Sequence, residues 1–253
     1  MSTSTVPVAA GAPWWRGNLA TIAVALAIAV VLKALIFQPF TIPSSSMEPT
    51  LRTGDYLIVS KFSYGWSRHS LPFSPPLFHG RLFATPPRRG DVIVFKLPRD
   101  QGRTDYVKRL IGLPGDRVQV RHGVVFINNV AFAQTPGRRR MDPESPFRPV
   151  SELRERNAEG RSYAIYQQAA DHDGENTPVY AVPSDQYFFM GDNRDNSLDS
   201  RWPGDIGVGF VPAENLVGKV EIVLASWGEG VSLFKPWTWV TKLDPHRVLR
   251  PIS

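Results

Sequence analysis

Hydrophobic residues are concentrated in one long stretch near the start of the chain. Residues 19–37 carry a single charge, Lys33. A helix of this length rises about 28 Å, close to the thickness of the hydrocarbon core of a bilayer. Trp14 and Trp15 precede the stretch, where interfacial aromatic residues are favoured. The pattern predicts a transmembrane anchor over 19–37, with a cleaved signal peptide and a buried soluble helix as the alternatives.

After residue 40 the hydrophobic residues form short runs, and no long amphipathic helix pattern occurs. The runs are rich in β-branched and aromatic residues and are bounded by Gly, Pro, Asp or Asn, which is typical of strands. We therefore predict a mainly β fold over 38–253, in which coiled antiparallel sheets form a partly closed, barrel-like domain. The expected strands are 56–61, 92–97, 106–111, 117–121, 124–128, 162–167, 179–182, 186–190 and 216–224.

Two segments interrupt this β pattern. Residues 66–89 are rich in proline and aromatic residues, and residues 135–176 are polar and densely charged, which indicates an inserted excursion at about 133–180. Within it, the basic run Arg138–Arg140 is interpreted as a solvated loop. Acidic residues are almost as frequent there, which argues against nucleic acid as a partner.

The composition excludes several classes of function. Hydrophobic residues are 42% and charged residues 21% of the chain, which fits neither a disordered nor a polytopic membrane protein. The absence of cysteine excludes disulfides, thiol catalysis and cysteine-ligated metals. The net charge of +6 permits contact with anionic lipid without requiring it.

The charges beside the predicted anchor favour one orientation. Arg16 and the α-amino group precede it, and residues 1–37 contain no acidic residue. The positive-inside tendency then places a short segment, 1–18, in the cytoplasm and the body of the chain on the opposite side of the membrane.

A cluster of serines follows the predicted anchor directly. Ser44, Ser45 and Ser46 lie between Pro43 and Pro49. Serines beside prolines are usually turn or cap residues, but their place here is next to the bilayer surface. A nucleophilic serine needs a base, and none of the five histidines lies in a recognisable triad motif.

The remaining candidate base is a lysine in the expected strand 106–111. Lys108 lies on one face of this strand and Arg109 on the other. Periodicity does not show which cation is buried, but only a lysine can lose its proton when it is desolvated. A pKa near neutrality requires a shift of roughly 3 units, or about 4 kcal/mol. The alternative is an ordinary solvated lysine on an edge strand.

A third candidate element is the loop Gly191–Arg201, which is rich in carboxylates and amides. As a calcium loop it fails, because Arg194 and Pro203 occupy positions that need oxygen ligands. We expect a turn held by ion pairs instead, with Arg194 bound to Asp192 or Asp195 and Asp199 bound to Arg201. Such a loop would hold the hydroxyl of Ser197 beside a base.

Together these segments resemble the type I signal peptidase family, the bacterial leader peptidases. The motifs that carry the resemblance are, in order, 43–51, Gly54-Asp55, 89–95, 106–109, 112–116, 191–201, Pro212 and 215–218. The resemblance implies that Ser46 is the nucleophile and Lys108 the general base. It implies that Ser44 supports the oxyanion together with the Ser46 N–H, that Ser197 orients Lys108, and that Asp199 and Arg201 form a supporting ion pair.

The resemblance also implies a substrate site and an activity. The residues expected to bind substrate are Phe40, Ile42, Pro43, Met47, Leu51, Leu57, Val94, Asp105, Tyr106 and Val107. The implied activity is that of a membrane-bound serine endopeptidase of the bacterial cytoplasmic membrane, single-pass, with its catalytic domain on the periplasmic side. It would remove signal peptides from exported preproteins by cutting after small residues of Ala-x-Ala type, without a metal or cofactor.

Two other classes of protein share parts of this pattern. A tethered β domain that binds peptides would use the same grooves without an activated lysine. A self-cleaving Ser/Lys repressor-type protease has a similar dyad, but it is soluble and carries a DNA-binding region where this chain has the apolar stretch.

Overall fold

The computed structural model describes residues 14–71, 74–142, 145–168, 174–228, 230–231, 235 and 237–252. Most of the predicted cytoplasmic segment, residues 1–13, lies outside the described residues.

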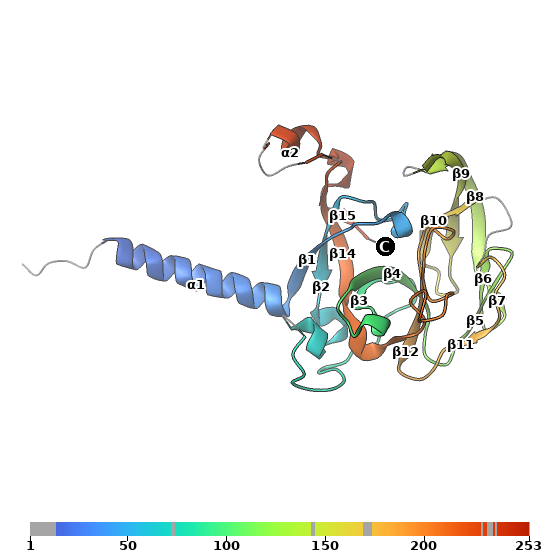
Figure 1. Ribbon diagram of the computed structural model, residues 1–253, viewed down its shortest axis with the longest axis horizontal. Coiled ribbons are helices and arrows are strands. Elements are labelled where there is room, and N and C mark those ends of the chain that lie inside the picture. Colours follow the sequence, from blue (N-terminus) through green and yellow to red (C-terminus); the bar gives the residue numbers. More distant parts are fainter. Residues whose placement is uncertain are drawn as a thin grey trace, which may run out of the picture.

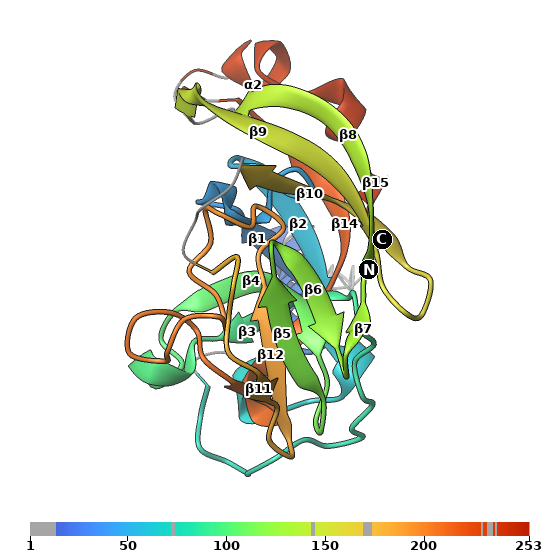
Figure 2. The ribbon, with the colours of Figure 1, turned by 90° about the vertical axis from the view of Figure 1, so that its right-hand side faces the viewer.

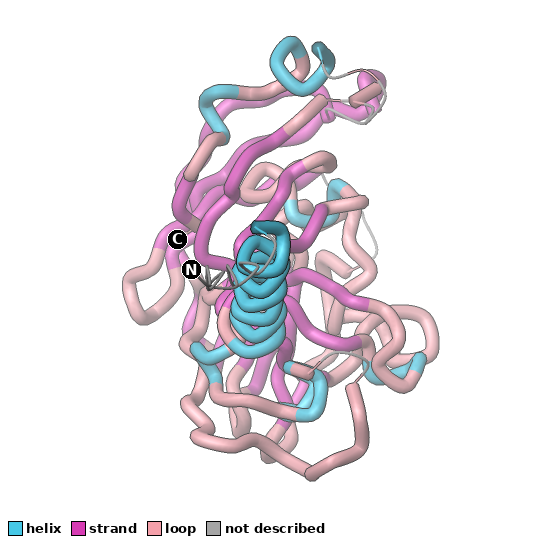
Figure 3. The backbone as a smooth tube through the Cα atoms, turned by 90° about the vertical axis from the view of Figure 1, so that its left-hand side faces the viewer, coloured by secondary structure: helices cyan, strands magenta, loops and turns pink. Residues whose placement is uncertain are grey.

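The chain begins with helix α1 (Trp14–Leu35), which projects from the β body in Figure 1 and is seen almost end-on in Figure 3. The side chains of residues 18–29 are all exposed on this helix. Among the described residues, no helix combines the length and the apolar character needed to cross a bilayer. The apolar stretch was expected to continue to Phe37, but Phe37 belongs to strand β1 (Phe37–Thr41), because it pairs with Ser60.

One large antiparallel sheet forms the centre of the molecule. Its order is β1, β2 (Asp55–Ser60), β14 (Leu216–Ser226), β3 (Val92–Lys96), β4 (Asp105–Gly112), β12 (Gln186–Met190) and β13 (Val211–Pro212), with β15 (Arg250–Pro251) beside β14. Strand β1 lies at one edge of this sheet. The sheet curls around the core in Figure 1, and the predicted mainly β fold is confirmed.

The described residues also form two smaller sheets. One has the order β11 (Tyr180–Ala181), β5 (Arg117–Arg121), β6 (Val124–Ile127) and β7 (Val130–Ala131). The other consists of β10 (Ser162–Gln168), β9 (Ser145–Arg156) and β8 (Ala133–Asp142), and we call it the excursion sheet. Its long strands β8 and β9 arch over the molecule in Figure 2.

The excursion sheet corrects one expectation. Arg138–Arg140 were interpreted as a solvated loop, but they lie within strand β8. Nearly all side chains of β8 are exposed, on both faces of the strand. The strand therefore lacks the alternation of apolar and polar residues by which strands are recognised in a sequence.

Short helices connect these strands. The second α-helix, α2, is Trp237–Thr241. Single turns of 3-10 helix occur at Ser45–Met47, Phe62–Tyr64, Arg68–Ser70, Pro98–Asp100, Ala213–Asn215 and Pro245–Arg247.

In the part of the chain that the structure describes, the hydrophobic core comprises three clusters, and the first lies beneath the serine segment. It joins Met47 and Leu51 to Leu57 on β2, Val94 on β3 and Val223 on β14. These side chains are almost completely buried. Burial of each large apolar side chain contributes about 2 kcal/mol, so this cluster fixes the segment that follows β1.

Candidate active site

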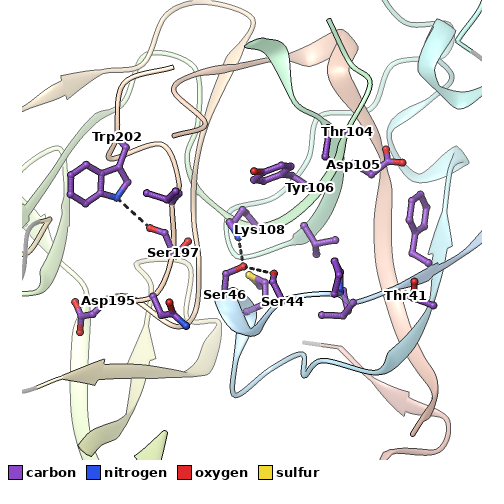
Figure 4. Close-up of a pocket in the computed structure, with 17 residues that line it drawn as sticks. Thr41, Ser44, Ser46, Thr104, Asp105, Tyr106, Lys108, Asp195, Ser197 and Trp202 are labelled. Atoms are coloured by element: carbon purple, nitrogen blue, oxygen red, sulfur yellow. Dashed lines mark hydrogen bonds between the residues drawn. The ribbon is translucent and has the colours of Figure 1, made fainter. Parts of the chain in front are cut away.

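Ser46 lies on the 3-10 turn that follows strand β1. The turn is closed by a hydrogen bond from the Glu48 N–H to the Ser45 carbonyl oxygen, 2.9 Å long. Met47 and Leu51 are buried in the core on either side of Pro49. With its neighbours anchored in this way, Ser46 is left half-buried, with its hydroxyl directed into a groove (Figure 4).

Lys108 comes from strand β4, where it pairs with Ile93 of β3. Its side chain is only 4% exposed, and a hydrogen bond joins its Nζ to the Ser46 Oγ. The sequence left open whether Lys108 or Arg109 is buried, and the structure buries both. Arg109 is paired with a carboxylate, that of Asp192, at 2.8 Å, whereas Lys108 faces a neutral hydroxyl.

Burial changes the acidity of Lys108. Desolvation lowers the pKa of its ammonium from 10.5 to about 8, against the opposing effect of the carboxylates of Asp199 and Asp192. Arg201 adds a smaller lowering effect. A substantial fraction of this amine is therefore neutral just above neutral pH, which is the state a general base requires.

Ser44 and Ser197 lie on different sides of the dyad. The Ser44 Oγ is 3.4 Å from the Ser46 Oγ. The predicted hydrogen bond between Ser197 and Lys108 is absent: the Ser197 hydroxyl is buried and has no hydrogen-bond partner among the described residues. It lies against Gly191, while the Ser197 carbonyl oxygen accepts a 3.3 Å hydrogen bond from the indole of Trp202.

The ion pairs of the loop 191–201 were predicted only in part. Asp199 pairs with Arg201 at 2.9 Å, as expected, and its Oδ2 also accepts a 2.9 Å hydrogen bond from the Gly191 N–H. The expected partners of Arg194 were wrong, because Arg194 binds Glu155 of β9. Asp192 binds Arg109 of β4 instead. Both true partners come from strands outside the loop, so local spacing could not reveal them.

A groove of about 640 Å³ surrounds the dyad, between β1, the start of β4 and the loop 195–202 (Figure 4). Of the expected substrate-binding residues, those that line it are Phe40, Ile42, Pro43, Met47, Asp105, Tyr106 and Val107. The other three, Leu51, Leu57 and Val94, were misplaced, because they are fully buried in the core behind Ile42 and Met47. A buried core residue supports the wall of the groove without touching a bound peptide.

Several lining residues were missed by sequence reasoning. They are Thr41, Thr104, Asp195, Asn196, Leu198 and Trp202. Asp195, Asn196 and Leu198 lie inside the candidate loop 191–201, and the other three lie within three residues of a candidate residue or motif, so proximity in sequence was the available signal. In the described part of the chain, no group of three or more His, Asp or Glu side chains is arranged to hold a metal ion.

Comparisons with known proteins identify the family of this chain. The model of the family described as "Signal peptidase, peptidase S26" matches residues 15–227. Signal peptidase I of Rickettsia canadensis is 37% identical over 240 residues, covering 88% of this chain and 88% of the relative. Signal peptidase I of Rickettsia typhi is 38% identical over 248 residues, covering 90% of this chain and 91% of the relative.

A solved structure is also similar. The crystal structure of a signal peptidase I from Enterococcus faecalis is 25% identical with a TM-score of 0.31, and the match covers 53% of this chain and 97% of that one. The extent of the family match and the identity to the two Rickettsia proteins show that this chain belongs to the type I signal peptidase family, peptidase S26, and is a serine endopeptidase.

Proposed function

We propose that the chain removes signal peptides from exported preproteins with Ser46 as nucleophile and Lys108 as general base. The observation that carries the proposal is the buried Lys108 amine, hydrogen-bonded to the Ser46 hydroxyl and with a pKa lowered by desolvation to about 8. Support for the substrate class comes from the relatives, which are named signal peptidase I.

The geometry supports a two-step acyl transfer. The neutral Lys108 amine takes the proton of Ser46 as its oxygen attacks the scissile carbonyl, and the protonated amine then donates that proton to the leaving amine. A water deprotonated by the same Lys108 amine hydrolyses the acyl-enzyme. The Ser44 hydroxyl, 3.4 Å from the Ser46 Oγ, would donate to the oxyanion with the Ser46 N–H, each donor contributing about 3 kcal/mol.

The walls of the groove support a preference for small side chains. Ile42 and Met47 are held in place by the core behind them, and Tyr106 and Val107 face them from β4. Fixed apolar walls of this kind favour small apolar side chains such as alanine, which is the basis for proposing Ala-x-Ala sites. Because β1 is an edge strand, an extended peptide can bind beside it in the manner of an added strand.

The same proposal includes a membrane location. Leu19, Ile22 and Leu26 are among the apolar side chains exposed on α1, which stands clear of the β body. We infer that the apolar part of α1, residues 19–35, anchors the chain in the bacterial cytoplasmic membrane as a single pass, with residues 1–18 inside and the catalytic domain on the periplasmic side. The partners are then signal peptides and the lipid bilayer, and nucleic acid has no role.

The proposal is tested with a purified preprotein that carries an Ala-x-Ala site, in detergent. Wild type is expected to cut after the second alanine, whereas Ser46→Ala and Lys108→Ala are inactive. Lys108→Arg is also expected to be inactive, because a guanidinium keeps the charge but cannot accept the serine proton.

Lys242→Ala, at an exposed lysine, serves as the control and keeps full activity. Near-normal turnover by Lys108→Arg would exclude the dyad. If wild type and all variants are equally inert, the chain is a tethered peptide-binding domain.

A further inference from the structure

A fully buried ion pair joins the excursion sheet to the loop 191–201. Glu155 of β9 is 0% exposed, and both of its carboxylate oxygens accept hydrogen bonds from the guanidinium of Arg194. Tyr163 of β10 and Gln134 of β8 also donate to this carboxylate, at 3.0 and 3.1 Å. Burial by itself raises the pKa of Glu155, but the Arg194 charge and these donors lower it below its ordinary value.

Arg194 also forms hydrogen bonds with the backbone of the loop and of β10, and so connects Glu155 to both. Its Nε donates to the Gly191 carbonyl oxygen at 3.2 Å, and its own N–H donates to the Tyr166 carbonyl oxygen of β10 at 2.9 Å. The Tyr166 N–H in turn donates to the Asp192 carbonyl oxygen, also at 2.9 Å. The loop is therefore bound along the edge of β10 and clamped at Arg194.

The same loop holds the backbone of the nucleophile. The Asn193 N–H donates to the Ser46 carbonyl oxygen at 3.1 Å, and its side-chain amide donates to the Ser45 carbonyl oxygen at 3.3 Å. Asn196 donates to the Ser45 hydroxyl at 2.9 Å. A shift of Arg194 would therefore displace the residues that position Ser46.

We propose that Glu155 is a positioning residue for catalysis, which sets the place of the Ser46 backbone through Arg194 and Asn193. The inference rests on the proposed function of the dyad. Glu155 lies outside the groove, so it acts on the geometry of the nucleophile and not on binding of the peptide. Displacement of a reacting atom by about 1 Å costs up to about 100-fold in rate.

The test compares kcat and KM for preprotein cleavage by the full-length chain in detergent, at a temperature at which circular dichroism shows every variant folded. In Glu155→Gln the side chain keeps nearly the same size and shape but loses its charge. The buried guanidinium of Arg194 then lacks its paired carboxylate. We expect its kcat to fall roughly 10- to 100-fold, with KM unchanged within about twofold. Glu155→Asp, which retains the charge, is expected to recover part of the lost kcat.

Glu152→Gln is the matched control, because Glu152 lies on the same strand and forms a more exposed ion pair with Arg140 at 3.5 Å. It is expected to cleave like wild type. If wild type cuts and Glu155→Gln matches this control, or loses affinity instead of kcat, the inference about Glu155 is overturned while the proposed function stands. A wild type that does not cut overturns both.

A milder variant keeps the inference testable if Glu155→Gln fails to fold. Tyr163→Phe removes one hydrogen bond to the Glu155 carboxylate and keeps the ring that packs on Arg109 at 3.8 Å. We expect a fall in kcat of about threefold or more at constant KM. Suppose that Glu155→Gln does not fold and that folded Tyr163→Phe has an unchanged kcat. Glu155 would then contribute only to the stability of the fold, and the inference would be overturned.

Discussion

Lys108 and Arg109 are neighbours on β4 and both are buried, but their partners differ: burial lowers the pKa of each side chain, and only Arg109 has a paired carboxylate that outweighs this effect. Arg109 is paired with both oxygens of Asp192 at 2.8 Å and stacks on the ring of Tyr163, so its charge is permanent. Lys108 has a hydroxyl, that of Ser46, as its hydrogen-bond partner, and desolvation lowers its pKa to about 8. Adjacent residues thus supply one fixed charge and one titratable base.

The pH dependence of cleavage follows from Lys108. In the mechanism that we propose, the neutral Lys108 amine is the active form, so kcat/KM is expected to rise about tenfold per pH unit below pH 8 and to level off above it. The measurement is kcat/KM from pH 6 to 10 with a substrate that does not titrate in this range. A flat profile between pH 6 and 9 would show that no amine base titrates there.

The lowered pKa of Lys108 also predicts that burying this side chain destabilises the fold at neutral pH. The pKa of Lys108 is about 8 in the folded chain and 10.5 as the ordinary value, so the unfolded chain holds this proton more tightly. The penalty is full below pH 8, about 3 kcal/mol, and disappears as the pH rises from about 8 to 10.5. Lys108→Met is therefore expected to raise the free energy of unfolding at pH 7 by up to about 3 kcal/mol, measured by urea denaturation.

The pH series supplies the control for this variant. The difference in the free energy of unfolding between Lys108→Met and wild type should shrink between pH 8 and 10.5. Over this range the wild-type chain no longer has to bury a charged ammonium group. A variant that is less stable than wild type at pH 7 would show that the Ser46 contact outweighs the cost of burying the amine.

At the scale of elements, the loop 191–201 packs so closely on the serine turn that one position excludes any side chain. A Cβ at Gly191 would lie 2.5 Å from the Ser46 carbonyl oxygen and would overlap the Ser197 hydroxyl. Real Cβ contacts are longer than this, so the loop must move away from Ser46 to admit even a methyl group.

Gly191→Ala is accordingly expected to lower kcat by about 100-fold, because the loop and the nucleophile separate. Gly204→Ala is the matched control, since a Cβ there meets no atom within 4 Å. Preprotein cleavage and thermal unfolding of both variants give the comparison. If both variants have the same kcat, the serine turn accommodates a side chain at residue 191 without loss of activity, and the prediction is wrong.

The elements differ in how well the sequence predicted them. Each of the expected strands overlaps a strand of the structure, because apolar, β-branched runs mark buried strands. Strand β1 was missed, and only its first residue, Phe37, was assigned to the apolar helix, since it continues the hydrophobic run. Strands β8 and β9 were missed, because they pair with each other over a polar, densely charged stretch, and β8 is exposed on both faces.

The site was predicted to a similar degree. Ser44, Ser46 and Lys108 were assigned from motifs, and the structure brings them together. The Glu155–Arg194 pair lay beyond prediction, because Glu155 lies in a segment without a motif and meets Arg194 only through the folding of the excursion sheet.

At the scale of the whole molecule, the C-terminal segment returns to the first strands. Strand β15 pairs with β14, and Arg247 binds both oxygens of the buried Asp55 at the start of β2. Arg247 also donates to the Thr50 carbonyl oxygen at 3.1 Å, four residues after the nucleophile. The segment thus connects β14 and the start of β2 to the residues that follow the serine turn.

Arg247→Ala is expected to destabilise the fold by about 3 kcal/mol, because it leaves the Asp55 carboxylate buried without its counter-charge. Arg52→Ala is the control, since its ion pair with Asp244 is 3.9 Å long and about 40% exposed. Its expected cost is below about 1 kcal/mol. Urea denaturation gives the free energy of unfolding of both variants. An equal decrease in the two would show that water solvates the Asp55 carboxylate when Arg247 is absent.

The three parts of the site are synthesised at very different times. The nucleophile at residue 46 and the amine at residue 108 emerge from the ribosome well before the loop 191–201, whose Asn193 fixes the Ser46 backbone. A growing chain that ends before this loop holds both reactive groups and lacks the clamp that aligns them. With Ser46 and Lys108 as the proposed dyad, the nascent chain is therefore expected to be inactive until the loop 191–201 has been translated and has folded against the serine turn.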